Sequence, residues 1–228
     1  PAETDGDAKL VALGRQLYDW LLAPVAEDLA KAKTTLIVPF GPLYYLPFHA
    51  LVMPPMPGAP ATAPPLWAIE KLRIGYLSST TVFKLLQRKK STTPRTMLAF
   101  ANPDGTLPGA RAEVERVQAT SFPAAKVFYE AQATKARFFE LASKYRILHF
   151  ATHGILDRDP LASSLKMAQG GLTVDEITGF SGLDQGTELV VLSACETAME
   201  AGKSNGDEVI SIASAFATAG APALVASL

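Results

Sequence analysis

RILHFATHG, residues 146–154, is a short apolar run that ends on a histidine and a glycine. Short apolar runs with β-branched and aromatic residues are typical of buried strands. A second run of this kind, ELVVLSA (188–194), is followed directly by Cys195, the single cysteine of the chain. The two runs predict strands of one sheet, with His153 at the carboxyl end of the first and Cys195 at the carboxyl end of the second.

The segments around these two runs alternate between strand and helix patterns. Further strands are predicted at 96–101, 126–130 and 221–227, and helices at 110–120, 134–143, 172–179 and 206–220. Thr134 is a candidate N-cap, Thr173 and Glu176 fit a capping box, and Gly220 ends the last helix. This alternation predicts an α/β fold, a mostly parallel sheet with helices on both faces. Right-handed crossovers would bring all strand carboxyl ends to one edge, where ligands bind in such sheets.

The first 90 residues have a less regular pattern. Residues 8–31 predict a helix interrupted at Pro24, and 79–90 predict a second helix. TTLIVPF (34–40) predicts a short buried strand, and the Pro- and Ala-rich stretch 53–65 predicts a surface loop. An apolar stripe on the first helix is expected to comprise Leu10, Leu13, Leu17, Trp20 and Leu21.

Composition excludes several classes of protein. The chain has 228 residues, 48% of them hydrophobic, and a net charge of −1, so a folded domain without a nucleic-acid-binding basic block is expected. No apolar stretch reaches the ~20 residues that a membrane span needs. A lone cysteine cannot form an internal disulfide or a multi-cysteine zinc site. We therefore expect a cytoplasmic protein with no cofactor or metal, and the absence of a Gly-rich phosphate-binding motif disfavours a nucleotide-binding domain.

His153 and Cys195 have the chemistry of a nucleophile and its base. An ordinary thiol, with a pKa of about 8.5, is mostly protonated at neutral pH, and a nearby imidazole can take its proton. The backbone N–H groups of Gly154 and Cys195 could hold the developing oxyanion of an acyl transfer. The alternative is a buried, inert cysteine beside a structural histidine. His149, in the middle of its strand, and His49 are expected to be structural.

HFATHG followed by LVVLSACETA closely resembles the corresponding motifs of the CHAT domain family, caspase-like domains often found with TPR repeats. The resemblance covers roughly residues 34–228, which leaves 1–33 as a helical linker or the end of an upstream helical module. Further matching segments occur in the expected order: LIVPFGPLYYLPFHAL (36–51), LPGARAEVE (107–115), ATKARFFELASKYRILHFATHG (133–154), LASSLKM (161–167), GLTVDEITG (171–179) and FATAGAPALVASL (216–228).

This resemblance implies a caspase/separase-like fold and cysteine endopeptidase chemistry. It implies that His153 is the general base and Cys195 the nucleophile of a simple dyad, and that Gly154 and Cys195 supply the oxyanion donors. Glu196 and Thr197 match the family motif and would border the cleft. Family members usually continue past the segment that ends at Leu228, so the resemblance also implies that the domain lacks its C-terminal elements here.

The resemblance further implies a protein substrate and restraint by an upstream TPR or sensor module or by an activating partner. Acidic residues in segments that could border the cleft favour a basic residue before the scissile bond; they are Asp157, Asp159, Glu196 and Asp207. Arg158 and Lys203 in the same segments act against this preference. The alternative function is that of a non-catalytic, caspase-like interaction or scaffold domain.

Overall fold

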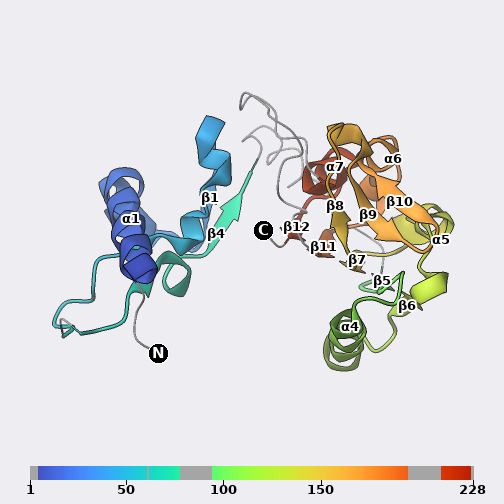
Figure 1. Ribbon diagram of the computed structural model, residues 1–228, viewed down its shortest axis with the longest axis horizontal. Coiled ribbons are helices and arrows are strands. Elements are labelled where there is room, and N and C mark those ends of the chain that lie inside the picture. Colours follow the sequence, from blue (N-terminus) through green and yellow to red (C-terminus); the bar gives the residue numbers. More distant parts are fainter. Residues whose placement is uncertain (1–4, 61, 78–93, 195–211, 227–228) are drawn as a thin grey trace. The chain divides into compact units, whose positions relative to one another are not determined.

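A computed structural model describes residues 5–60, 62–77, 94–194 and 212–226 of the chain. The chain divides into two compact units, residues 1–84 and 85–228 (Figure 1). The predicted helix at 79–90, the beginning of the helix expected at 206–220, and Cys195 lie outside the described residues.

The first unit opens with a helix that is interrupted at Pro24, as expected. It comprises α1 (Asp5–Leu21), a 3-10 turn (Ala23–Val25) and α2 (Ala26–Lys31). The predicted apolar stripe is wrong for three of its members, because Leu10, Leu13 and Trp20 are 61%, 48% and 64% exposed.

The buried side of α1 is formed by Gly14 and Tyr18, and Leu22, directly after the helix, is also buried. Tyr18 and Leu22 pack in one cluster with Phe48 and Leu51. Gly14 lets the helix approach β2 closely, because a Cβ at this position would lie 3.1 Å from a methyl carbon of Val52. Apolar side chains occur on both sides of this helix, so periodicity alone could not show which side would be buried.

The rest of the first unit consists of short paired segments. β1 (Thr35–Ile37) runs parallel to β4 (Ile74–Tyr76), and β2 (Val52–Met53) pairs antiparallel with β3 (Leu66–Trp67). Three 3-10 turns connect them, Gly41–Tyr45, Phe48–Ala50 and Ala68–Glu70. The strand predicted at 34–40 is therefore shorter than expected and only half-buried. Met53 ends β2, and the rest of the described part of 53–65 is a loop between β2 and β3, as predicted. His49 contacts the Tyr76 hydroxyl at 3.3 Å.

The second unit is built on a five-stranded parallel sheet. The strand order is β12–β11–β7–β5–β6, and every neighbouring pair is parallel. The strands are β5 (Met97–Ala101), β6 (Lys126–Tyr129), β7 (Ile147–Ala151), β11 (Leu189–Ser193) and β12 (Leu224–Ala226). This confirms the predicted sheet and makes the two apolar runs, now β7 and β11, direct neighbours.

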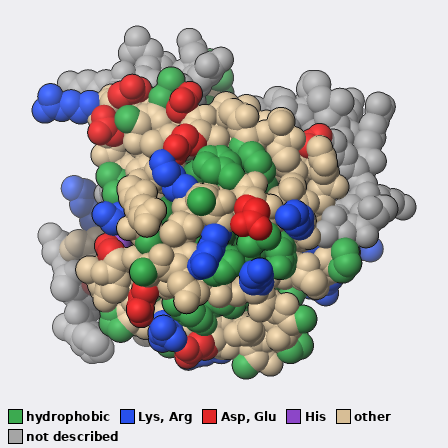
Figure 2. Space-filling view, turned by 90° about the vertical axis from the view of Figure 1, so that its right-hand side faces the viewer, with side chains coloured by type: hydrophobic (Ala, Val, Ile, Leu, Met, Phe, Trp, Pro, Cys, Tyr) green, Lys and Arg blue, Asp and Glu red, His purple; other side chains and the backbone are tan. Residues whose placement is uncertain are grey.

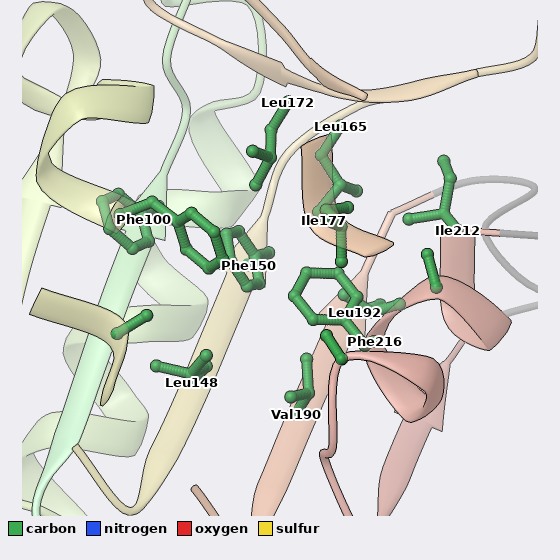
Figure 3. Close-up of a cluster of buried hydrophobic side chains, with 14 of the residues drawn as sticks. Phe100, Leu148, Phe150, Leu165, Leu172, Ile177, Val190, Leu192, Ile212 and Phe216 are labelled. Atoms are coloured by element: carbon green, nitrogen blue, oxygen red, sulfur yellow. The ribbon is translucent and has the colours of Figure 1, made fainter. Parts of the chain in front are cut away.

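Helices cover both faces of this sheet, which confirms the α/β class (Figure 1). One face packs against α4 (Pro108–Ser121), through a cluster that includes Met97, Ala99 and Val114. The other face packs against α5 (Lys135–Leu141), α6 (Val174–Thr178) and α7 (Ile212–Thr218). Aromatic rings fill this second layer: Phe150 stacks on Phe100 and lies 5.4 Å from Phe216, ring centre to ring centre (Figure 3).

The predicted helix caps are present. The Thr134 hydroxyl accepts the N–H of Arg137, and Thr173 and Glu176 form a reciprocal capping box at the start of α6. Gly220 follows α7 with a φ of +104°, a conformation that favours glycine.

A three-stranded antiparallel sheet was not predicted. It comprises β8 (Gly154–Ile155), β9 (Ser164–Met167) and β10 (Gly170–Thr173), in the order β10–β9–β8. Strands of two to four residues are too short to give a periodic signal. Because β8 begins at Gly154, this small sheet is joined directly to His153.

Charges are mixed on the face of the second unit that Figure 2 shows. Lys and Arg side chains alternate with Asp and Glu and do not gather into one basic patch on that face. Among the described residues, no helix is both long and apolar enough to cross a membrane.

Candidate functional site

Three strand ends meet at the carboxyl edge of the parallel sheet. Ser193, the last residue of β11, lies opposite Ala151, the last residue of β7, and the Ser193 carbonyl accepts the N–H of Thr152 at 3.2 Å. His153 is two residues past Ala151, and Cys195 is two residues past Ser193. Cys195, Glu196 and Thr197 lie outside the described residues, so their roles remain predictions.

The third strand end brings a hydrogen-bonded loop to His153. After β5, Asn102 adopts a φ of +50°, and its side-chain oxygen accepts the N–H of Leu107 at 2.7 Å. This closed loop places the Thr106 hydroxyl 2.7 Å from Nε2 of His153. Asp104 in turn accepts the Thr106 hydroxyl at 2.8 Å and the Thr106 N–H at 3.2 Å.

These contacts determine the tautomer of the neutral His153 ring. A carboxylate can only accept hydrogen bonds, so the Thr106 hydroxyl must donate its single hydrogen to Asp104. The same oxygen then accepts a hydrogen from Nε2 of His153, which leaves Nδ1 with a free lone pair. The hydrogen bond from the Thr106 hydroxyl lowers the pKa of Asp104, with a smaller contribution from His153, and so keeps the carboxylate ionised.

The small antiparallel sheet fixes the backbone on the other side of His153. The carbonyl of His153 accepts the N–H of Lys166, and the Thr152 hydroxyl donates to the carbonyl of Lys166, both at 2.8 Å. Gly154 lies opposite Leu165, the next pair along this ladder. Hydrogen-bonded and non-hydrogen-bonded pairs alternate in antiparallel ladders, so the N–H of Gly154 points away from β9.

A hydrogen-bonded network around the partly exposed Glu113 carboxylate lies beneath the strand ends on the α4 side. Oε1 of Glu113 is 2.9 Å from Nε2 of His149, and Oε2 accepts the Ser193 hydroxyl at 2.9 Å. His149 is 5% exposed, as expected for a structural histidine, and burial lowers its pKa more than the nearby Glu113 raises it. The neutral form of His149 is therefore favoured, and in that form its Nε2–H donates to Glu113.

A cavity of about 330 Å³ opens between the first turn of α4 and the two central strand ends. Its lining comprises Leu107, Pro108, Gly109, Ala110, Glu113, Thr152, His153, Ser193 and Ala194. The volume is at the lower end of the range of small-ligand pockets. The site therefore combines an imidazole of defined tautomer, a carboxylate and a hollow on one sheet edge.

Three residues of this site were missed by the sequence pattern. Asp104 belongs to NPDG, which indicates only a turn, and Thr106 follows that turn without any distinguishing signal. Glu113 has the appearance of a solvated carboxylate in a helix. Only the motif LPGARAEVE, quoted above for its resemblance, draws attention to this region.

Asp157, by contrast, makes hydrogen bonds within its own loop. It accepts the N–H of Asp159 at 3.0 Å, while its own N–H donates to the Ser163 hydroxyl. It is not among the residues that line the cavity. Within the described part of the chain, no group of three or more His, Cys, Asp or Glu side chains could hold a metal ion.

Comparison with known proteins identifies the family. The sequence model of the CHAT domain matches residues 11–228, so the match includes most of α1 as well as the segment 34–228. The domain boundary proposed at residue 33 remains a prediction. A search of curated proteins finds no match. The sheet, the order of its motifs and this match over nearly the whole chain show that the protein belongs to the CHAT domain family, which is linked to caspase-like peptidases.

Proposed function

We propose that the chain is a cysteine endopeptidase in which His153 activates Cys195. The observation that carries this proposal is the parallel pairing of β7 and β11, whose register puts Ala151 opposite Ser193. Both candidate residues follow these partners by two positions. CHAT family membership supports the same chemistry, and the cavity beside His153 offers space for a peptide side chain.

The proposed reaction proceeds through an acyl-enzyme. Nδ1 of His153 takes the proton of the Cys195 thiol, and the thiolate attacks the scissile carbonyl carbon. The backbone N–H groups of Gly154 and Cys195 stabilise the oxyanion. The imidazolium then donates its proton to the leaving amine as the peptide bond breaks, which leaves a thioester. Water, deprotonated by His153, hydrolyses the thioester and releases the acid product and the free thiol.

Thr106 and Asp104 act in this proposal as positioning residues. The Thr106 oxygen holds Nε2–H of His153, so that Nδ1 is left to accept the thiol proton. The ionised Asp104 carboxylate orients the Thr106 hydroxyl. The predicted dyad of His153 and Cys195 would therefore be supported by the Thr106 hydroxyl and the Asp104 carboxylate.

Replacing Thr106 with valine tests this positioning. The variant keeps the side-chain shape but loses the hydrogen bond to Nε2, and one such bond is worth about 10-fold in rate. We expect the rate of alkylation of Cys195 by iodoacetamide at pH 7 to fall by about that factor. Thr106→Ser restores the hydroxyl and should recover most of the rate. Equal rates in wild type and Thr106→Val would contradict the positioning role.

The alternative function is a caspase-like interaction domain without catalysis. A peptide library prepared from a proteome separates the two functions, because each cleavage creates a new N-terminus that mass spectrometry detects. Endopeptidase activity predicts new N-termini with the wild-type chain and none with Cys195→Ala. If wild type and Cys195→Ala give the same N-termini, the scaffold function is favoured.

We further propose that the natural substrate is a protein and that activity is restrained by an upstream TPR or sensor module or by an activating partner. Support comes from the CHAT family resemblance.

A further inference from the structure

The cavity beside His153 is the place where the side chain next to the scissile carbonyl would enter. His153 itself lines it, and so does Ser193, two residues before Cys195. In the proposed reaction the scissile carbonyl lies between the base and the nucleophile. The residue that contributes this carbonyl is therefore the one whose side chain is nearest the cavity.

Glu113 gives this cavity a negative charge. Its side chain is 38% exposed, so the carboxylate is accessible although both oxygens are held by the protein. Each carboxylate oxygen has two lone-pair sites, so contacts with His149 and Ser193 leave capacity for a further donor. Burial lowers the pKa of His149 and favours its neutral form, in which it donates a hydrogen bond to Glu113 without cancelling the charge of the carboxylate.

Other charges near the cavity do not reverse this effect. The first turn of α4 forms one wall, and a helix N-terminus carries roughly half a positive charge, which is smaller than the full charge of Glu113. Arg111 on the same helix is engaged with Glu115 and Glu130 and lies over the ring of Tyr129. Among the residues that the structure describes, the lining includes no Lys or Arg.

We propose that Glu113 selects a lysine or arginine before the scissile bond by pairing with its cationic side chain. This inference rests on the proposed peptidase function and names its substrate class. The sequence attributed a preference for a basic substrate residue to acidic loop residues such as Asp157. The structure attributes it instead to Glu113 on α4, which lines the same cavity as His153.

The test uses peptidyl acyloxymethyl ketones that differ only in the last residue, arginine or citrulline. Citrulline has nearly the shape of arginine but no charge. The thiolate attacks the ketone methylene carbon, a C–S bond forms and the carboxylate leaves, so intact mass reports labelling of the single cysteine. For a partly exposed ion pair we expect wild type to label about 5-fold faster with arginine. A ratio near one in wild type would overturn the inference.

Glu113→Gln removes the charge and keeps a hydrogen-bonding amide, and its arginine-to-citrulline ratio should fall to near one. Glu115→Gln is the matched control, since it removes a carboxylate from the same helix that pairs with Arg111, and it should keep the wild-type ratio. The selecting role of Glu113 would also be rejected by an unchanged ratio in Glu113→Gln. Faster labelling of wild type by a ketone whose last residue is acidic would reject it as well. Ordinary labelling rates with every ketone and with iodoacetamide would instead count against the peptidase function itself.

Discussion

His153→Ala is expected to lower kcat/KM for the best peptide from the library by about 10³-fold, the usual worth of a general acid–base. The variant loses the group that takes the thiol proton and later protonates the leaving amine. Within the described part of the chain, this ring is only partly buried and its hydrogen bond goes to Thr106 in an exposed loop. The thermal unfolding temperature should therefore change little.

His49→Ala is the matched control for this variant. His49 lies in the other unit, where it contacts the Tyr76 hydroxyl. Its replacement should leave kcat/KM near the wild-type value. Loss of activity in His49→Ala of the same size as in His153→Ala would show that removing a histidine acts through the fold and not through the chemistry.

Phe150→Ala is expected to destabilise the second unit by about 3–5 kcal/mol, the range for a buried phenylalanine cut to alanine. Phe150 is fully buried on β7 and contacts the rings of Phe100 and Phe216 (Figure 3). It also contacts the ring of Phe138. The cavity left behind would lie three residues from His153, so activity should be lost at temperatures where wild type is still folded. Urea unfolding followed by circular dichroism measures the change.

Phe139→Ala is the matched comparison, because it makes the same replacement of phenylalanine by alanine at a more exposed position. Phe139 is next to Phe138 on α5 and touches its ring, but it is 37% exposed. Its loss should cost clearly less free energy of unfolding than that of Phe150. Equal costs would contradict the assignment of Phe150 to the centre of the core.

The sequence predicted the parallel sheet because its strands are continuous apolar runs between recognisable helices. The same pattern placed His153 at a strand end, since the order of elements and the handedness of crossovers leave one edge for all the carboxyl ends. Helix caps such as Thr134 and Thr173 are local features, and they were predicted for that reason.

The missed features depend on contacts between distant segments. Thr106 meets His153 across 47 residues, and Glu113 meets Ser193 across 80. Neither pairing produces a periodic pattern of residues that could be recognised in a single sequence. The exposed stripe on α1 was mispredicted for a related reason: the packing of Tyr18 and Leu22 against Phe48 and Leu51, and not the spacing of Leu10, Leu13 and Trp20, decides which side is buried.

The pH dependence of Cys195 alkylation by iodoacetamide tests the central claim most directly, because the chain has a single thiol and no substrate is needed. If His153 activates Cys195, the wild-type rate should reach its thiolate plateau well below the ordinary thiol pKa of about 8.5. In His153→Ala the midpoint of the curve should move up to about that value. Superimposable curves for wild type and His153→Ala, both centred near the ordinary thiol pKa, would contradict the claim.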